Sequence, residues 1–380
     1  MVLYESLRRH LPEAILHVLA LSDECEQFLL RADLSGMVVV PIFRILEDEP
    51  RLAKARPMRS ETEFIFTLTP YIVLETLKAC RSGEHAVYLD ADMMFFSSPA
   101  DFVKTSDAFD VSITPHNFSS HMQDQARFGI YNVGWVGFKK TTGGERCANW
   151  WAEQCLGWCH DRLENGKFAD QKYLESFDKI ASSVQTSNPV GLNCAPWNAS
   201  GHRFHSNGQT VLVDGQPLIL YHFAKVKRIN PWCIATRTKL QGVIGAKGLN
   251  RCVYRPYAQA LKSASDHYEI PAEWSFRRSN PRHGVKYRGF ERDEAPGRLS
   301  ILARILRGDY VASKSTDIFK IVGHSQPAPE PNGRQNAGTE LVSPQNKIPT
   351  ISLVTPSFNQ SKWGWLAVKM ENLVSSLRGR

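Results

Sequence analysis

The sequence predicts an α/β protein, with a single domain built on a mixed, mostly parallel sheet and a basic, mostly helical C-terminal extension. Two observations indicate this class. Short apolar runs alternate with amphipathic segments through the first two-thirds of the chain, which is typical of strands covered by helices on both faces. After about residue 240 this alternation is replaced by basic sequence whose pattern favours helix.

The strands and helices expected in the domain follow from the apolar pattern. Residues 86–89 form a continuous apolar run that leads directly into Asp90. We therefore expect Asp90 at the carboxyl end of a strand, which is the edge where open α/β sheets bind ligands. The other predicted strands are 14–21, 38–41, 110–114, 131–138 and 217–221, and the predicted helices are 62–79 and 146–159.

Composition sets limits on the class of protein. The chain has 380 residues and is 42% hydrophobic, which is normal for a globular protein. Its apolar stretches, such as 37–43, are far shorter than the ~20 residues that cross a bilayer, and no signal pattern opens the chain. We therefore expect a cytoplasmic protein. Eight cysteines occur without a CxxC pair, which favours buried thiols over a metal site.

The net charge of +8 is concentrated in one basic stretch, residues 277–292. Such a stretch fits an anionic partner, for which an acidic membrane surface, an anionic glycan acceptor and nucleic acid all qualify. A solvated basic face explains it equally well. No zinc, helix-turn-helix or RNA-recognition pattern surrounds the stretch, so we expect no nucleic-acid partner. The basic residues are Arg277, Arg278, Arg282, Lys286, Arg288 and Arg292.

Asp90 and Asp92 carry the chemistry that the sequence shows most directly. They flank Ala91 at the end of a predicted strand, so both carboxylates can turn toward one hard cation. A lone DxD is a weak signal, but the apolar strand before this one makes two unneutralised charges costly. The alternative is a solvated acidic loop that caps the next helix. We expect a magnesium or manganese site here.

Four motifs stand in the order found in a known family. They are YLDADMMFFSSP, YNVGWVGF, FADQKYL and LILYHFAKVK. Over roughly residues 1–235 the chain resembles the nucleotide-diphospho-sugar transferases of the glycosyltransferase A fold, and family 8 is the nearest relative. The resemblance implies a Rossmann-like domain and a hexosyltransferase of polysaccharide biosynthesis. Such an enzyme uses Mn²⁺ or Mg²⁺ to move a sugar, with retention, from its donor to a glycan, lipid-linked or other cell-surface acceptor.

The resemblance also implies roles for individual residues. Asp90 and Asp92 match the pair that binds the metal and the donor diphosphate, and His222 matches a late histidine ligand. Asn132 and Gly134 match a loop where a glycine lets the backbone approach the donor sugar, although a glycine at a strand bulge is an equal reading.

Further matches concern the donor and its phosphates. Asp170 and Gln171 match an Asp-Gln pair at the donor sugar and its anomeric carbon, although Asp170 alone would pass as a helix cap. Lys227 matches a lysine that contacts the diphosphate, but Lys225 stands where relatives often have glycine. Lys225, Lys227 and Arg228 therefore all stay candidates for phosphate contact. Arg59 falls where relatives have a basic donor-site residue.

The chain departs from this family at both ends. Relatives have a central first strand before the helix with which this chain opens, and ISLVTPSFNQ near the C-terminus resembles the start of a family 2 glycosyltransferase. We expect a catalytic domain at 1–240, an extension at 241–323, a flexible linker at 324–347 and a truncated family 2-like segment at 348–380. One hypothesis is that 351–354 fills the vacant central strand position. The alternative is a fragment with a disordered tail, or a catalytically inactive sugar-nucleotide binding protein.

Overall fold

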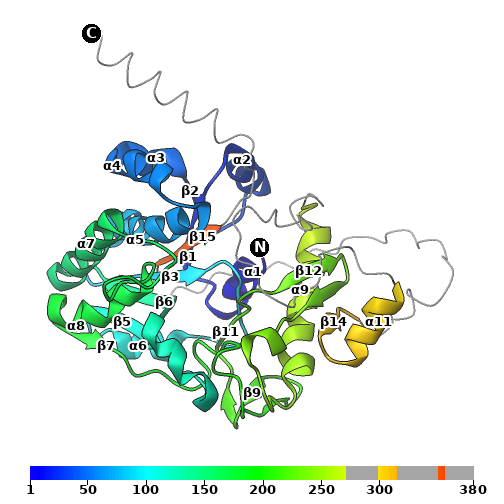
Figure 1. Ribbon diagram of the computed structural model, residues 1–380. Helices are drawn as coiled ribbons and strands as arrows, with labels where there is room; N and C mark the ends of the chain where they lie inside the picture. The colour runs from blue at the N-terminus through cyan, green and yellow to red at the C-terminus, as the bar shows by residue number, and fades with distance from the viewer. Residues whose placement is uncertain (271–297, 315–349, 356–380) are drawn as a thin grey trace.

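A seven-stranded sheet forms the centre of the fold in this computed structural model, which describes residues 1–270, 298–314 and 350–355 (Figure 1). In chain order its strands are β1 (Ile15–Ala20), β2 (Met37–Pro41), β3 (His85–Asp90), β5 (Val111–Pro115), β6 (Tyr131–Lys139), β7 (Val184–Gln185) and β15 (Thr350–Thr355). Across the sheet the order is β2-β1-β15-β3-β6-β5-β7. β6 is antiparallel to its neighbours and all other pairs are parallel, so the predicted α/β class with a mixed, mostly parallel sheet is confirmed.

The centre of this sheet is supplied by β15, from far along the chain. β15 lies parallel between β1 and β3, with Ile351 opposite both Leu16 and Val87, and Val354 opposite Asp90. The hypothesis that 351–354 fills the central position is therefore confirmed for the backbone. The two sides of the sheet become continuous, since β1 and β3 pair with β15 and not with each other.

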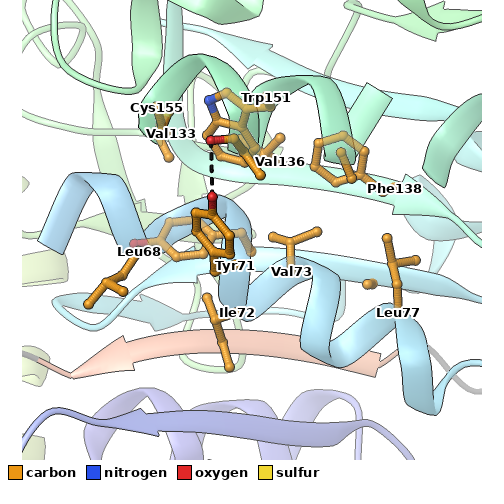
Figure 2. Close-up of a cluster of buried hydrophobic side chains, with 14 of the residues drawn as sticks. Leu68, Tyr71, Ile72, Val73, Leu77, Val133, Val136, Phe138, Trp151 and Cys155 are labelled. Carbon is orange, nitrogen blue, oxygen red and sulfur yellow. Dashed lines mark hydrogen bonds between the residues drawn. The ribbon is translucent and has the colours of Figure 1, made fainter. Parts of the chain in front are cut away.

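The longest helix beside the sheet is α5 (Glu61–Ala79), which confirms the helix predicted at 62–79. It starts with a capping box, because the Glu63 amide donates to Ser60 Oγ at 3.3 Å and the Ser60 amide donates to Glu63 Oε2 at 2.7 Å. α5 lies next to β15 and β3 on one side and α7 (Thr142–Gly157) on the other (Figure 2). The capped helix thus covers the strand that completes the sheet.

The interface between α5 and α7 belongs to the main hydrophobic core. Leu68 and Ile72 of α5 and Trp151 of α7 are fully buried (Figure 2). The Tyr71 hydroxyl donates to the carbonyl of Ala152 at 3.5 Å, which ties the two helices together. Burial of an aromatic or leucine side chain contributes about 1.5–3 kcal/mol relative to exposure, so this interface contributes strongly to stability.

Smaller elements surround the sheet and form a second apolar region. The helices are α1 (Val2–His10), α2 (Asp23–Ala32), α3 (Ile42–Asp48), α4 (Arg51–Ala55), α6 (Ala100–Ser106) and α8 (Phe177–Ile180), with short helical turns at η2 (Ser120–Phe128) and η3 (Gln171–Ser176). The strands outside the main sheet are β4 (Met93–Phe95), β8 (Phe204–Ser206), β9 (Val211–Val213), β10 (Gln216–Pro217), β11 (Leu220–His222), β12 (Lys227–Asn230) and β13 (Cys233–Ala235).

Two boundaries differ from the sequence prediction. The helix expected at 146–159 begins earlier, because Thr141 caps it by accepting the Gly144 amide at 3.1 Å. The strand expected at 217–221 is divided, because β10 pairs with β9 whereas β11 pairs with β4. The second change affects the candidate site, since β11 carries His222 beside the segment that follows Asp90.

The described part of the predicted extension packs against the rest of the protein. It contains α9 (Arg255–His267), α11 (Arg298–Leu306) and β14 (Tyr310–Ala312). β14 pairs with β13, and the ring of Tyr257 stacks on Phe223 at 3.6 Å between centroids. The expected domain boundaries stay predictions, and the basic stretch and the linker lie outside the described residues.

Two further expectations concern cysteines and membrane helices. All eight cysteines are buried, so the expectation of buried thiols is confirmed. Among the described residues, no helix combines the length and the apolar character that crossing a bilayer requires.

Candidate metal centre and donor site

The fold brings Asp90, Asp92 and His222 together. Asp90 ends β3, and Asp92 lies in the turn between β3 and β4. β4 pairs antiparallel with β11, which places His222 opposite Met93, and the Phe223 amide donates to the Asp92 carbonyl at 2.8 Å. Backbone pairing therefore fixes a histidine more than a hundred positions away in sequence beside the DxD pair.

The three side chains present their ligand atoms to one another. His222 Nε2 lies 3.0 Å from Asp92 Oδ1 and 3.6 Å from Asp90 Oδ2. One ligand atom from each residue falls within 4.8 Å of the others, a spacing that could hold a metal ion. The His222 side chain is 8% exposed, whereas those of Asp90 and Asp92 are 31% and 46% exposed. The histidine of the cluster is therefore buried in the protein, whereas its two carboxylates are accessible from solvent.

Sequence reasoning missed Tyr88 as part of this cluster. Its hydroxyl donates to Asp90 Oδ1 at 2.8 Å, which leaves Oδ2 to face His222. Residues two apart in a strand lie on the same face, so the spacing of Tyr88 and Asp90 could have revealed this contact. Trp197 was missed as well, and its ring meets that of His222 edge-on at 5.2 Å between centroids.

The titration of the cluster reflects crowded negative charge. Burial, with repulsion from Asp92, raises the pKa of Asp90 to about 6 despite attraction to His222. Although burial opposes ionisation, the charge and hydrogen bond of His222 hold the pKa of Asp92 below its usual value. The same carboxylates overcome the burial of His222 and raise its pKa to about 9. The folded cluster favours extra positive charge, which a divalent cation would supply.

Asp170, a residue of the predicted donor site, is close enough to the cluster to feel the charge of Asp90. It precedes η3, it is 4% exposed, and burial together with the charge of Asp90 raises its pKa to about 7. A hydrogen bond with Thr69 acts in the opposite direction. Its side chain makes no helix-capping hydrogen bond, so the capping interpretation of Asp170 does not explain its position.

Asn132 and Gly134 of β6 lie beside the Nδ1 atom of His222, on the side of the ring that faces away from the two aspartates. The Gly134 amide donates to Asn132 Oδ1 at 2.8 Å. A Cβ on Gly134 would lie 2.3 Å from Asn132 Oδ1 and 3.2 Å from His222 Nδ1, so any other residue would force Asn132 to move. The pairing of β6 with β5 is also irregular across this region, which agrees with the interpretation of Gly134 as a bulge glycine. Approach of its backbone to a donor sugar stays a prediction.

The remaining predicted residues are placed as follows. Gln171 Nε2 donates to the carbonyl of Phe128 at 3.0 Å, which fixes the amide. Lys227 begins β12, five residues after His222.

Lys225 has a φ of 62°, which lies in the left-handed region that favours glycine. The family 8 enzymes that the sequence resembles often have glycine at this position. Contact of Lys225, Lys227 or Arg228 with a phosphate stays a prediction.

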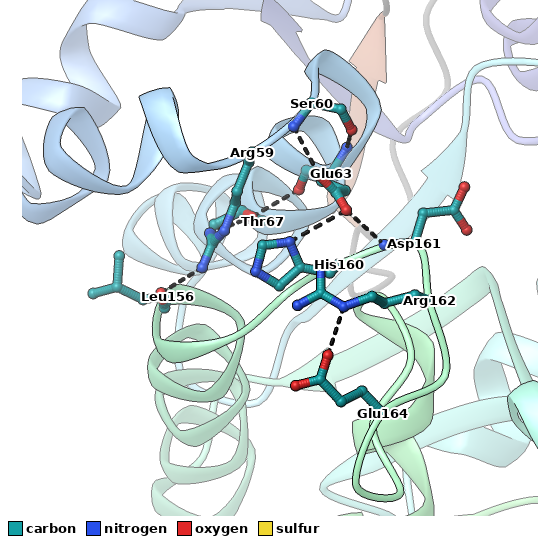
Figure 3. Close-up of polar contacts among 9 residues, drawn as sticks. All are labelled: Arg59, Ser60, Glu63, Thr67, Leu156, His160, Asp161, Arg162 and Glu164. Carbon is teal, nitrogen blue, oxygen red and sulfur yellow. Dashed lines mark hydrogen bonds and ion pairs between the residues drawn. The ribbon is translucent and has the colours of Figure 1, made fainter. Parts of the chain in front are cut away.

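Arg59 makes a structural contact in addition to any role in donor binding. Its guanidinium donates to Thr67 Oγ1 and to the carbonyl of Leu156, each at 2.5 Å, and so links the start of α5 to the end of α7 (Figure 3). Glu63 accepts from the Asp161 amide at 3.0 Å on the same side of α5. The donor-site role of Arg59 stays a prediction.

The residues present fit a divalent metal. Two carboxylates and one imidazole form a donor set that could hold a divalent cation. The raised pKa values of Asp90 and His222 agree with a site that favours added positive charge.

Fold and cluster together define an α/β protein with a candidate three-residue metal centre at the carboxyl edge of its sheet. The chain is similar to two curated proteins of Bacillus subtilis (strain 168), both described as uncharacterized. YfnF is 29% identical over 230 residues, which cover 58% of this chain and 75% of YfnF. YfnD is 26% identical over 227 residues, which cover 59% of this chain and 72% of YfnD.

Among solved structures, the chain is similar to mouse xyloside xylosyltransferase 1 in its apo form. The two are 12% identical with a TM-score of 0.36, over 59% of this chain and 90% of that chain. No family model matches the chain. A likeness this low leaves function to be argued from the residues of this chain.

The pKa shifts predict how stability depends on pH. Asp90, Asp170 and His222 have pKa values above those of the unfolded chain, so their contribution to the free energy of unfolding is lost as pH rises through about 6, 7 and 9. The lowered pKa of Asp92 acts only at more acidic pH. We expect the melting temperature of chelator-treated protein to fall between pH 6 and about 9.

Because Mn²⁺ competes with protons for these groups, it should raise the melting temperature more at pH 8 than at pH 5.5, by roughly 5 °C at saturating metal. Differential scanning calorimetry with chelator or MnCl₂ at both pH values measures this, with NaCl at matched ionic strength as the control. An equal Mn²⁺ effect at the two pH values would contradict the electrostatic account of the cluster.

Proposed function

We propose that the chain is a metal-dependent glycosyltransferase that moves a sugar from a nucleotide-diphospho-sugar to a glycan, lipid-linked or other cell-surface acceptor. The observation that carries the proposal is the convergence of Asp90, Asp92 and His222 at the carboxyl edge of a mostly parallel sheet. Asp170 lies within electrostatic reach of Asp90, so three of the four sequence motifs supply ionisable side chains to one place. The fourth motif supplies Asn132 and Gly134 beside His222.

In this proposal Asp90, Asp92 and His222 hold the ion, preferably Mn²⁺ and otherwise Mg²⁺. When bound, the ion supplies Lewis-acid stabilisation of the leaving nucleoside diphosphate. Tyr88 orients the carboxylate of Asp90. Lys227, with Lys225 and Arg228 as alternatives, neutralises phosphate charge from the segment after His222, and Arg59 is the remaining basic candidate.

Asp170 and Gln171 are proposed to bind the donor sugar. With a pKa near 7, Asp170 holds a proton through part of the neutral range and can donate a hydrogen bond to a sugar hydroxyl. Gln171 is held by its hydrogen bond to Phe128, which fixes its side chain for contact near the anomeric carbon. Retention of anomeric configuration is proposed from the family 8 resemblance.

The wider assignments are proposals of the same kind. We place the enzyme in the cytoplasm, in polysaccharide biosynthesis, with peripheral contact between its basic stretch and an anionic membrane or acceptor and without a nucleic-acid partner. We also propose a catalytic domain at 1–240 whose sheet takes its central strand, β15, from the family 2-like segment at 348–380. The competing function, an inactive sugar-nucleotide binding protein, would follow from a vacant central strand position, and β15 occupies that position.

A panel of nucleotide sugars tests the function. With Mn²⁺ present, we expect one class of nucleotide-diphospho-sugar to raise the melting temperature and to release nucleoside diphosphate slowly. A ligand at 100 times its Kd stabilises the native state by about 2.7 kcal/mol. Chelator should abolish both effects. Stabilisation without release would support the inactive binding protein, and neither effect with any nucleotide sugar would contradict the proposed function.

A further inference from the structure

Asn193 is a buried side chain next to the candidate metal centre, and no role has yet been given to it. It is 1% exposed, and neither its Nδ2 nor its Oδ1 has a hydrogen-bond partner among the described residues. His222 Nδ1, on the ring face away from the two aspartates, lacks a partner in the same part of the chain. A buried amide without partners costs on the order of 1–3 kcal/mol for each unmade bond, so such groups call for an explanation.

Asn193 Oδ1 and His222 Nδ1 both lie beside Gly134. A Cβ built on Gly134 would lie 2.9 Å from Asn193 Oδ1 and 3.2 Å from His222 Nδ1. Because glycine has no Cβ, both atoms can approach its Cα closely. Asn132 Oδ1 lies in the same place, but it already accepts the Gly134 amide at 2.8 Å. Asn193 Oδ1 is therefore an acceptor beside Gly134 that is still uncommitted.

The backbone holds Asn193 in this position. Cys194 forms a parallel bridge with Tyr221 of β11, in which the Cys194 amide donates to the Leu220 carbonyl at 3.1 Å and the His222 amide donates to the Cys194 carbonyl at 2.8 Å. Asn193 itself has a φ of 60°, a left-handed conformation that asparagine tolerates better than most residues. The same strand pairing thus fixes both Asn193 and His222.

The chemistry of His222 explains what the acceptor is for. Its Nε2 faces Asp92 and Asp90, so a metal held by these residues would take the Nε2 lone pair. The ring must then carry its hydrogen on Nδ1, and a metal-binding histidine generally donates that hydrogen to a carbonyl, carboxylate or water. In the Asn193 orientation described, the amide oxygen and not the nitrogen lies beside Gly134 together with His222 Nδ1.

We propose that Asn193 is a positioning residue for His222. Its Oδ1 accepts the Nδ1 hydrogen when a metal takes Nε2, and so fixes the tautomer and ring orientation that present Nε2 to the divalent metal. This role rests on the proposed metal site. It also accounts for the asparagine at a left-handed position, for the glycine at position 134 and for the lack of other partners of Asn193 Oδ1 and His222 Nδ1 among the described residues.

Two variants test the proposal against a merely structural role. Asn193→Gly removes the amide but keeps a residue that adopts the left-handed backbone without strain. Asn193→Asp keeps an oxygen acceptor. We expect Asn193→Gly to weaken Mn²⁺ binding at least about tenfold, as loss of a partner behind a metal ligand does elsewhere, and Asn193→Asp to bind Mn²⁺ at least as tightly as the parent.

The full-length chain is titrated with Mn²⁺ alone, and free Mn²⁺ is measured by electron paramagnetic resonance. Asn188→Gly is the matched control, because this asparagine in the same segment donates to the Leu192 carbonyl at 3.0 Å and does not border the site. It should leave the Mn²⁺ affinity unchanged. Melting curves in chelator check that each variant is folded.

The outcomes separate this proposal from the one on which it rests. Parent-like Mn²⁺ affinity in Asn193→Gly, or equal weakening in both Asn193 variants, overturns the positioning role while the metal site stands. Absence of Mn²⁺ binding by the parent protein overturns the metal site and this role together. A loss in Asn193→Gly that Asn193→Asp restores supports the proposal.

Discussion

Replacing Asp92 with asparagine is expected to reduce metal-dependent sugar transfer on the order of 10²–10³-fold while leaving the protein folded. The change removes the negative charge of the carboxylate whose Oδ1 lies 3.0 Å from His222 Nε2, and it replaces one carboxylate oxygen with an amide nitrogen that cannot bind a metal. It alters little volume at a side chain that is 46% exposed. The contact that holds the turn is made by the Asp92 carbonyl, which the substitution retains.

The measurement is the rate of sugar transfer as a function of Mn²⁺ concentration, together with a melting curve. Asp101→Asn is a suitable control, since Asp101 is an exposed aspartate in the first turn of α6, outside the metal cluster. Parent-like activity of Asp92→Asn with the same Mn²⁺ dependence would refute the assignment of Asp92 as a ligand. Loss of the folded state would show that the turn depends on the carboxylate.

Introducing proline into β15 is expected to produce the largest loss of stability. Leu353 lies opposite Val18 of β1 and Leu89 of β3, in the middle of a strand that has neighbours on both sides. Proline cannot donate to the strand ladder and is therefore confined to edge strands, strand starts and bulges, and each buried hydrogen bond left unmade costs on the order of 1–3 kcal/mol. We expect Leu353→Pro to lower the melting temperature by roughly 10 °C.

Leu353→Val is the matched control, because it keeps the backbone N–H and should melt close to the parent. Activity should fall in the proline variant as well, since Val354 lies opposite Asp90 and the position of β3 depends on its neighbour. A melting curve identical to that of the parent would show that β15 does not complete the sheet in solution.

Local pattern predicted the elements that lie close together in sequence. The apolar run before Asp90 identified both β3 and the edge at which the DxD pair lies, since a buried parallel strand is apolar on both faces. The strand-like composition of 351–354, with the absence of the first strand that the resemblance implies, led to the hypothesis that this segment fills the central position, and the strand pairing confirms it. The division of 217–221 was not predictable, because it depends on which distant strands β10 and β11 meet.

The sequence predicted only part of the candidate site. His222 could be named from a resemblance, but its distance from Asp92 depends on the pairing of β4 with β11. Asn193 carries no signal of its own, because its significance comes from atoms of Gly134 and His222 that only the fold brings near. Arg59 could be named from the resemblance as a donor-site residue, but its structural contacts could not. Its guanidinium links α5 to α7 through Thr67 and Leu156.

The central position of β15 has a consequence for how the protein is made. Asp90 at the end of β3 and Thr350 at the start of β15 are 260 positions apart. At ~5–20 residues per second, a ribosome needs on the order of 15–50 s to cover that distance. Throughout this interval the backbone edges of β1 and β3 that face β15 have no native partner. Nascent chains would therefore pass through a long aggregation-prone stage, in which a chaperone that shields strand edges would increase the yield of folded protein.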